Sequence, residues 1–283
     1  MCDMLTIHTP LPSRDRHVAV FYLHGGGLLY GERDDLPAPY VQMMLEAGYT
    51  LVCADYPLAP EAPLPEIVDA VFDLWRSSVG SRLLSGEFAG HFLFGRSSGA
   101  HLALLLAREI ARRETDQRLQ PLGVLDFYGY HDLADAAFHD PARAYLSLPE
   151  VPRTQIARFL HAPSPIVTSG PKPLRFNLYV HARQHAGAWI ELLGLDGSEP
   201  RRDVEAWSLS DDDIAALPPL FICASTDDED VPYRISKTLA RAARAAVMKT
   251  VYYLPHDFDR DLTKPDGRTV YGQALDWMAR RLG

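Results

Sequence analysis

The chain has 283 residues, a formal net charge of −9 at pH 7 and 47% hydrophobic residues. This length suits one α/β domain with room for an insertion, and the composition is that of a folded chain rather than a disordered one. The acidic balance argues against nucleic acid as a partner, because phosphate binding needs clustered Lys and Arg.

The cysteines and the N-terminal residues bear on the cellular compartment. Cys53 and Cys223 each lie in an apolar run typical of a buried strand, which predicts free thiols. The first residues lack the basic start and apolar stretch of a signal peptide, and no apolar run is long enough to cross a membrane. We therefore expect a cytoplasmic protein with no membrane span.

Apolar runs alternate with helical patterns over residues 1–129. The runs predict strands at 4–8, 17–25, 49–56, 91–95 and 121–129, and the patterns between them predict helices at 36–48, 65–79 and 99–114. Near-continuous apolar strands separated by helices predict an α/β fold, in which a mostly parallel sheet is covered by helices on both faces.

The alternation stops over residues 130–217, which are rich in Pro, His and Arg and include short helical patterns at 152–161 and 181–194. It resumes with a predicted strand at 218–225, a helix at 232–247, a strand at 250–256 and a closing helix at 267–282. The sequence thus predicts a core formed by residues 1–129 and 218–283, and a helical cap insertion at 130–217.

A Gly-Arg-Ser-Ser-Gly segment, residues 95–99, joins a predicted strand to a predicted helix. This is the context of a nucleophile elbow, whose central residue has a strained backbone and whose neighbours must be small. The pattern places Ser97 at the tip and turns the backbone N–H of Ser98 toward it, and we expect no role for the Ser98 hydroxyl. The segment alone also fits an ordinary Gly-Ser turn.

Three glycines follow His24 at the end of another predicted strand. Glycine allows unusual backbone angles, so that backbone N–H groups can face into a pocket and stabilise the oxyanion of a tetrahedral intermediate. Gly26 and Gly27, together with Ser98, are the predicted oxyanion donors. A phosphate-binding loop is the alternative, but the GxxxxGK[ST] pattern is absent from the sequence.

A base and an acid follow the last two predicted strands. His256 follows the final strand, and an acidic loop with Asp227, Asp228 and Asp230 follows the strand before it. Nucleophile, acid and base in this chain order suit a Ser-Asp-His triad. We favour Asp228 as the acid, then Asp227, and interpret the remaining acids as a solvated helix cap.

Further residues are candidates for the pocket. Tyr128, Tyr130 and His131 follow the carboxyl end of a strand, where α/β sites open. Trp189 and Tyr179 in the insertion are weaker candidates.

Other polar residues are assigned no catalytic role. Asp55 and Glu61 are expected to hydrogen-bond the glycine loop. His181 and His185 lack the adjacent Glu of a zinc-binding helix, so we predict no metal.

Together these motifs resemble the α/β hydrolases of the hormone-sensitive-lipase-like esterase group, and more closely the small bacterial esterases and acetyl hydrolases. The resemblance rests on HGGG (24–27), DYPLAPEAPLPEIVDA (55–70), GRSSGAH (95–101), DDEDVPY (227–233) and HDFDRD (256–261). It implies hydrolysis of short-chain carboxylic esters, with a serine triad, an acyl-enzyme, a small-molecule ester substrate and no cofactor.

This sequence departs from the group's pattern at Pro57, where Arg is common, and at Arg96 and Ser98, where an acidic residue and Ala are common. An arylformamidase or another amidase would use the same triad and remains an alternative. A non-catalytic ligand-binding protein on this fold is less favoured, because such proteins typically lose the histidine that is present here as His256. The sequence leaves the oligomeric state open, a homodimer included.

Overall fold

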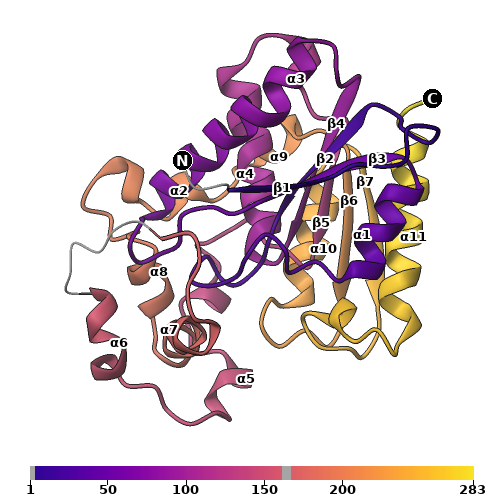
Figure 1. Ribbon diagram of the computed structural model, residues 1–283. Helices are drawn as coiled ribbons and strands as arrows, with labels where there is room; N and C mark the ends of the chain where they lie inside the picture. The colour runs from indigo at the N-terminus through magenta and orange to yellow at the C-terminus, as the bar shows by residue number, and fades with distance from the viewer. Residues whose placement is uncertain (1–3, 161–166) are drawn as a thin grey trace.

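The computed structural model describes residues 4–160 and 167–283, and over these residues seven strands form one sheet (Figure 1). The strand order is β1-β3-β2-β4-β5-β6-β7, and every neighbouring pair is parallel except β1 with β3. The strands are β1 (Leu5–His8), β2 (Val18–Leu23), β3 (Tyr49–Ala54), β4 (Gly90–Arg96), β5 (Val124–Phe127), β6 (Leu220–Ser225) and β7 (Ala246–Val251). The predicted α/β class with a mostly parallel sheet is confirmed.

Helices cover both faces of this sheet, and each face has its own apolar core. One core includes side chains of α2 (Leu64–Trp75), α4 (Ser98–Arg113) and α10 (Tyr233–Ala242), and the other includes those of α1 (Ala38–Glu46) and α11 (Pro265–Ala279). Every residue of β2, β3, β4, β5 and β6 is buried. Burial on two faces explains why these strands are continuously apolar in the sequence.

Between β5 and β6, the described residues form helices and no strand of the sheet. These are α5 (Arg143–Leu146), α6 (Arg153–Leu160), α7 (Lys172–Gln184), α8 (Ala188–Leu192) and α9 (Asp211–Ala216). In Figure 1, α5 to α8 gather at one end of the molecule, whereas α9 lies near α4. The division into a core of residues 1–129 and 218–283 and a cap of residues 130–217 stays a prediction.

Three predicted elements have different bounds in the structure. The helix expected over 181–194 is two helices: α7 ends at Gln184, where His185 is extended, and α8 begins at Ala188, after Gly187 with its φ of 71°. The helix expected over 232–247 ends at Ala242, and the last strand is 246–251 rather than 250–256. The Ala- and Arg-rich run favours a helix by propensity, but parallel pairing with β6 makes its end a strand.

A buried ionic network lies beneath the turn between β4 and α4. Asp259, fully buried, accepts hydrogen bonds from Arg96 Nη2 (2.8 Å), the Tyr128 hydroxyl (2.8 Å) and the Tyr271 hydroxyl (2.9 Å). Arg96 is only 2% exposed and also donates from Nε to the Tyr128 oxygen at 2.6 Å. The network ties the C-terminal segment to the residue that precedes Ser97.

We predict that Asp259→Ala lowers the free energy of unfolding by about 3–5 kcal/mol, because it leaves the Arg96 charge buried without its partner. Urea unfolding followed by circular dichroism measures this. The matched control is Asp276→Ala on the exposed side of α11, where the expected change is within about 0.5 kcal/mol. Equal stability of the two variants would contradict a structural role for the network.

Candidate active site

Ser97 lies in a strained turn at the carboxyl end of β4. Its backbone angles are φ 54° and ψ −123°, in a region that residues with side chains rarely adopt. A Cβ on Gly95 would overlap the backbone of Gly99, and a Cβ on Gly99 would overlap the carbonyl of Leu23. Both glycines are therefore required for the turn, which directs Ser97 to the edge of the sheet where parallel strands end.

Ser97, His256 and Asp228 form a hydrogen-bonded chain. Ser97 Oγ lies 2.8 Å from His256 Nε2, and His256 Nδ1 lies 2.6 Å from Asp228 Oδ2. The other carboxylate oxygen of Asp228 accepts from the backbone N–H groups of Asp230 and Val231 at 2.9 and 2.8 Å. In the neutral imidazole, a proton on Nδ1 leaves Nε2 free to accept from the serine hydroxyl.

Of the acids weighed from the sequence, Asp228 is the one that meets His256. Asp227 is exposed, and its backbone N–H donates to the Ser225 hydroxyl at 3.4 Å. Asp230 is buried, which contradicts the expectation that it is a solvated capping residue. Its carboxylate accepts from the hydroxyls of Tyr145 and Tyr179, side chains far away in the sequence, so spacing within the acidic loop did not reveal it.

The surroundings of His256 change its pKa in opposite directions. Burial alone lowers the pKa of the imidazole, but the charge and hydrogen bond of Asp228, with the nearby charges of Asp230 and Asp257, raise it to about 9. The imidazolium form is therefore strongly stabilised in this site. Only the neutral imidazole can accept a proton, so the fraction of His256 able to act as a base grows as the pH rises toward 9.

The glycine loop has unusual backbone angles, with φ of 112° at Gly26 and 61° at Gly27. The Gly26 carbonyl accepts from the backbone N–H groups of Leu29 (3.0 Å) and Tyr30 (3.1 Å). Among the described residues, none accepts a hydrogen bond from the N–H groups of Gly26, Gly27 or Ser98. Three unpaired donors beside a serine could stabilise an oxyanion.

The Ser98 hydroxyl, for which the sequence suggested no role, makes a contact within the structure. Its oxygen accepts a hydrogen bond from the backbone N–H of Leu28 at 3.3 Å, and it is fully buried. It also interacts with the Tyr56 hydroxyl, which donates to the His24 carbonyl at 2.8 Å. The second serine therefore links the elbow to the glycine loop, a role that the sequence pattern does not reveal because Ala is common at this position.

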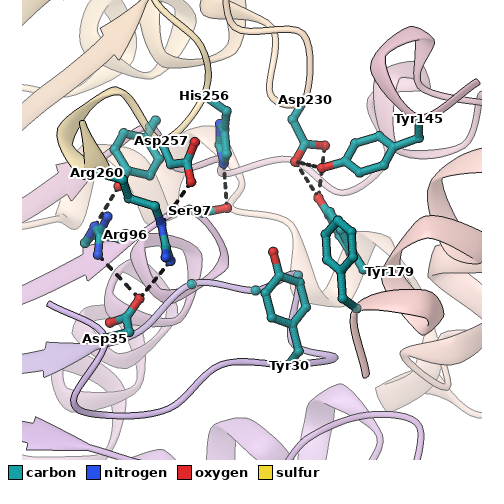
Figure 2. Close-up of a pocket in the computed structure, with 15 residues that line it drawn as sticks. Tyr30, Asp35, Arg96, Ser97, Tyr145, Tyr179, Asp230, His256, Asp257 and Arg260 are labelled. Carbon is teal, nitrogen blue, oxygen red and sulfur yellow. Dashed lines mark hydrogen bonds and ion pairs between the residues drawn. The ribbon is translucent and has the colours of Figure 1, made fainter. Parts of the chain in front are cut away.

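A cavity of about 260 Å³ opens above Ser97 (Figure 2). Its lining consists of Gly25, Gly26, Gly27, Tyr30, Asp35, Arg96, Ser97, Tyr128, Tyr145, Phe176, Tyr179, Asp230, His256, Asp257 and Arg260. Figure 2 shows the Tyr30 side chain pointing into the space between Ser97 and Tyr179. The cavity is thus aromatic and polar at once, and its residues come from both halves of the sheet and from the segment between β5 and β6.

One of the three predicted pocket residues lines the cavity, and the other two do not. Tyr128 lines the cavity, and its ring lies 4.8 Å from that of His256. Tyr130 and His131 are not in the lining, and both are buried. The chain turns inward after β5, so that Tyr130 stacks on His101 with ring centroids 4.7 Å apart. Placing them in the pocket is therefore wrong.

The two weaker candidates of the insertion both contact the glycine loop. Tyr179 lines the cavity, and Trp189 Nε1 donates to the Gly27 carbonyl at 2.9 Å. Asp55 and Glu61, expected to hydrogen-bond this loop, contact arginines instead, and of the two arginines Arg175 donates to the Leu29 carbonyl just beyond the glycines at 2.6 Å. Asp55 accepts from the backbone N–H of Arg33 at 2.7 Å, and Glu61 pairs with Arg175 Nη1 at 2.8 Å.

No group of three or more His, Cys, Asp or Glu within the described ranges could hold a metal ion. The rings of His181 and His185 have centroids 4.3 Å apart and are tilted by 45° to each other, and a nitrogen of each faces the Val151 carbonyl. Cys53 and Cys223 are buried free thiols, as predicted. Over the same part of the chain, no helix has the length and apolar character needed to cross a membrane.

The family profile of the alpha/beta hydrolase fold matches residues 20–259, and the chain belongs to this family. A crystal structure of an alpha/beta hydrolase superfamily protein from Enterococcus faecalis is 30% identical, with a TM-score of 0.77 over 96% of this chain and 93% of that one. A protein of unknown function from Staphylococcus aureus subsp. aureus Mu50 is 31% identical, with a TM-score of 0.78 over 98% and 93%.

Several curated relatives are named as enzymes. A non-reducing polyketide synthase of Aspergillus calidoustus is 28% identical over 72% of this chain, and an esterase of Acinetobacter venetianus is 31% identical over 40%. The chain spans only 8% and 36% of these two proteins. A probable carboxylesterase M8 of a Phoma species is 26% identical over 88% of this chain and 82% of its own length.

The raised pKa of His256 predicts that the imidazole titrates near pH 9 and that Asp228→Asn lowers this midpoint, because a negative charge is lost. Since the folded pKa exceeds the ordinary 6.5, the associated stability is fully present below pH 6.5 and is lost as the pH rises through 9. NMR of labelled imidazole nitrogens measures both midpoints. A wild-type midpoint below 6.5, or no change in Asp228→Asn, would contradict this electrostatic description.

Proposed function

We propose that the protein is a serine hydrolase that cleaves short-chain carboxylic esters through an acyl-enzyme. The main support is the hydrogen-bonded chain from Ser97 through His256 to Asp228, which shares one cavity with the free N–H groups of the glycine loop. The esterase and carboxylesterase among the curated relatives support the same reaction. The cavity of about 260 Å³ suits a small acyl or alcohol group rather than a long chain.

In this proposal, Ser97 Oγ attacks the ester carbonyl carbon while His256 Nε2 takes its proton. The negative charge that develops on the carbonyl oxygen accepts hydrogen bonds from the N–H groups of Gly26, Gly27 and Ser98. The tetrahedral intermediate then collapses, the C–O bond to the alcohol breaks, and His256 returns the proton to the leaving alkoxide. Asp228 stays ionised throughout and stabilises the imidazolium.

The second half of the reaction reverses these roles. A water molecule gives a proton to His256 and its oxygen attacks the acyl carbon on Ser97. The same N–H groups stabilise the second oxyanion, and His256 returns the proton to Ser97 as the carboxylic acid leaves. The 16-residue helix α4 begins at this point and adds the positive end of its dipole to the stabilisation.

We also infer that residues 130–217 act as a cap over the site. Three residues of the cavity lining, Tyr145, Phe176 and Tyr179, belong to this segment. The side chains that meet the acyl and alcohol groups would then come largely from it, as insertions in α/β folds commonly provide specificity.

The nucleophile is tested by comparing Ser97→Ala with Ser98→Ala on p-nitrophenyl acetate and butyrate. We expect Ser97→Ala to lower kcat by roughly 10⁴-fold or more and to abolish labelling by a fluorophosphonate probe. Ser98→Ala keeps its backbone N–H, so the loss there should stay within about tenfold, and labelling should persist. Absence of wild-type turnover, or turnover and labelling that persist in Ser97→Ala, would contradict the proposal.

The acid is tested by a matched pair of variants in the acidic loop. Asp228→Asn should lower kcat by roughly 10⁴-fold, because the amide favours the wrong histidine tautomer. Asp227→Asn, at the adjacent exposed position, should stay within about twofold of the wild type. Steady-state kinetics with p-nitrophenyl butyrate measure both, and equal losses would show that the assignment of Asp228 is wrong.

A further inference from the structure

The glycine loop and the acidic loop lie on opposite sides of Ser97. The glycine loop follows β2 and the acidic loop follows β6, whereas Ser97 follows β4, which lies between these strands in the sheet. Catalysis by the proposed mechanism needs the donors of one loop and the acid of the other in a fixed relation to the serine. Displacements of about 1 Å in such groups can cost two orders of magnitude in rate.

Two side chains of the insertion hold the glycine loop at Gly27. Trp189, 2% exposed, donates from Nε1 to the Gly27 carbonyl at 2.9 Å. The ring of Tyr179 lies directly against Gly27, where a Cβ would overlap the ring. The Gly27 carbonyl shares its peptide plane with the Leu28 N–H, so the bond from Trp189 fixes that plane. Through the Gly27 Cα it also restricts the adjacent plane, which contains the Gly27 N–H.

The same two side chains reach the acidic loop at Asp230. The Tyr179 hydroxyl donates to the Asp230 carboxylate at 2.8 Å, beside the hydroxyl of Tyr145 at 2.9 Å (Figure 2). Trp189 reaches Asp230 through Arg183, whose guanidinium lies 5.7 Å from the indole ring and donates from Nη2 to the Asp230 carbonyl at 3.0 Å.

Asp230 in turn orients the proposed catalytic acid. Its backbone N–H donates to Asp228 Oδ1 at 2.9 Å, and the opposite carboxylate oxygen of Asp228 faces His256. A shift of Asp230 would therefore rotate the carboxylate that contacts the histidine. Asp230 is 7% exposed, so water does not readily replace the groups that hold it.

We propose that Tyr179 and Trp189 are positioning residues through which the helical insertion fixes the glycine loop relative to the acidic loop. Each connects Gly27 to Asp230 by a separate route, one through a phenol and one through an indole and a guanidinium. The insertion thus helps to assemble the catalytic groups, in addition to lining the cavity. This inference rests on the proposed hydrolase function, because it concerns the groups that would stabilise that reaction's transition state.

Two conservative variants test the proposal. Tyr179→Phe removes the hydroxyl and keeps the ring against Gly27, whereas Trp189→Phe removes the indole N–H and keeps an aromatic ring. Tyr233→Phe is the matched control, since the Tyr233 hydroxyl pairs with the Thr250 hydroxyl at 2.6 Å and no part of Tyr233 lines the cavity. Rates are expressed per site labelled by a fluorophosphonate probe, which corrects for any misfolded fraction.

We expect each of the two variants to lower kcat for p-nitrophenyl butyrate by about tenfold, with KM within about twofold of the wild type, because the lost contacts act on the transition state. Affinity for a trifluoromethyl ketone, which mimics the tetrahedral intermediate, should fall by the same factor. A role in folding alone would lower the labelled fraction and leave the rate per labelled site unchanged. Tyr233→Phe should match the wild type.

Wild-type kcat per labelled site in either folded variant would overturn the proposal, as would a rise in KM with unchanged kcat, which indicates a substrate contact only. If the wild type turns over esters and Ser97→Ala does not, such a result leaves the hydrolase function intact. If the wild type does not turn over esters, the proposed function fails and this inference fails with it.

Discussion

The backbone conformation of Ser97 is the constraint on which the rest of the site depends. A residue with a side chain at φ 54° and ψ −123° carries strain of about 1–3 kcal/mol, which the surrounding structure must offset. The Ser97 N–H donates to the Phe127 carbonyl at 2.8 Å, and the two flanking glycines allow the closest backbone approaches in the turn. The strained turn thus follows the carboxyl end of β4, the central strand of a mostly parallel sheet that is covered on both faces.

Structure on two sides of this turn supports it. Below the turn, Arg96 is buried against Asp259, which links β4 to the C-terminal segment that also contains His256. Above the turn, side chains of the insertion meet both the glycine loop and the acidic loop. The serine is therefore enclosed between an ionic network and an aromatic one. Each network joins chain segments that are far apart in sequence, so the site depends on completion of the whole fold.

The features that could be predicted from the sequence are the residues that follow the ends of strands. Ser97, Asp228 and His256 each follow a strand, and parallel strands bring their carboxyl ends to one edge, so chain order sufficed to propose that they meet. It did not predict contacts between distant segments. Tyr130 packs against His101 in the core, and Asp230 is buried against tyrosines of the insertion. The Ser98 hydroxyl accepts a hydrogen bond from the Leu28 N–H. The predicted position of β7 was wrong because pairing with β6 outweighs the helix propensity of these residues.

Covalent capture of the acyl group tests the central claim most directly. Rapid quenching of the protein with a slowly hydrolysed p-nitrophenyl ester, followed by peptide mass spectrometry, would locate the acyl group. The account predicts an adduct with the mass of the acyl group on the peptide that contains Ser97, with fragmentation placing it at Ser97 and not at Ser98. An adduct at another residue, or ester turnover with no acyl adduct at any time, would contradict the account.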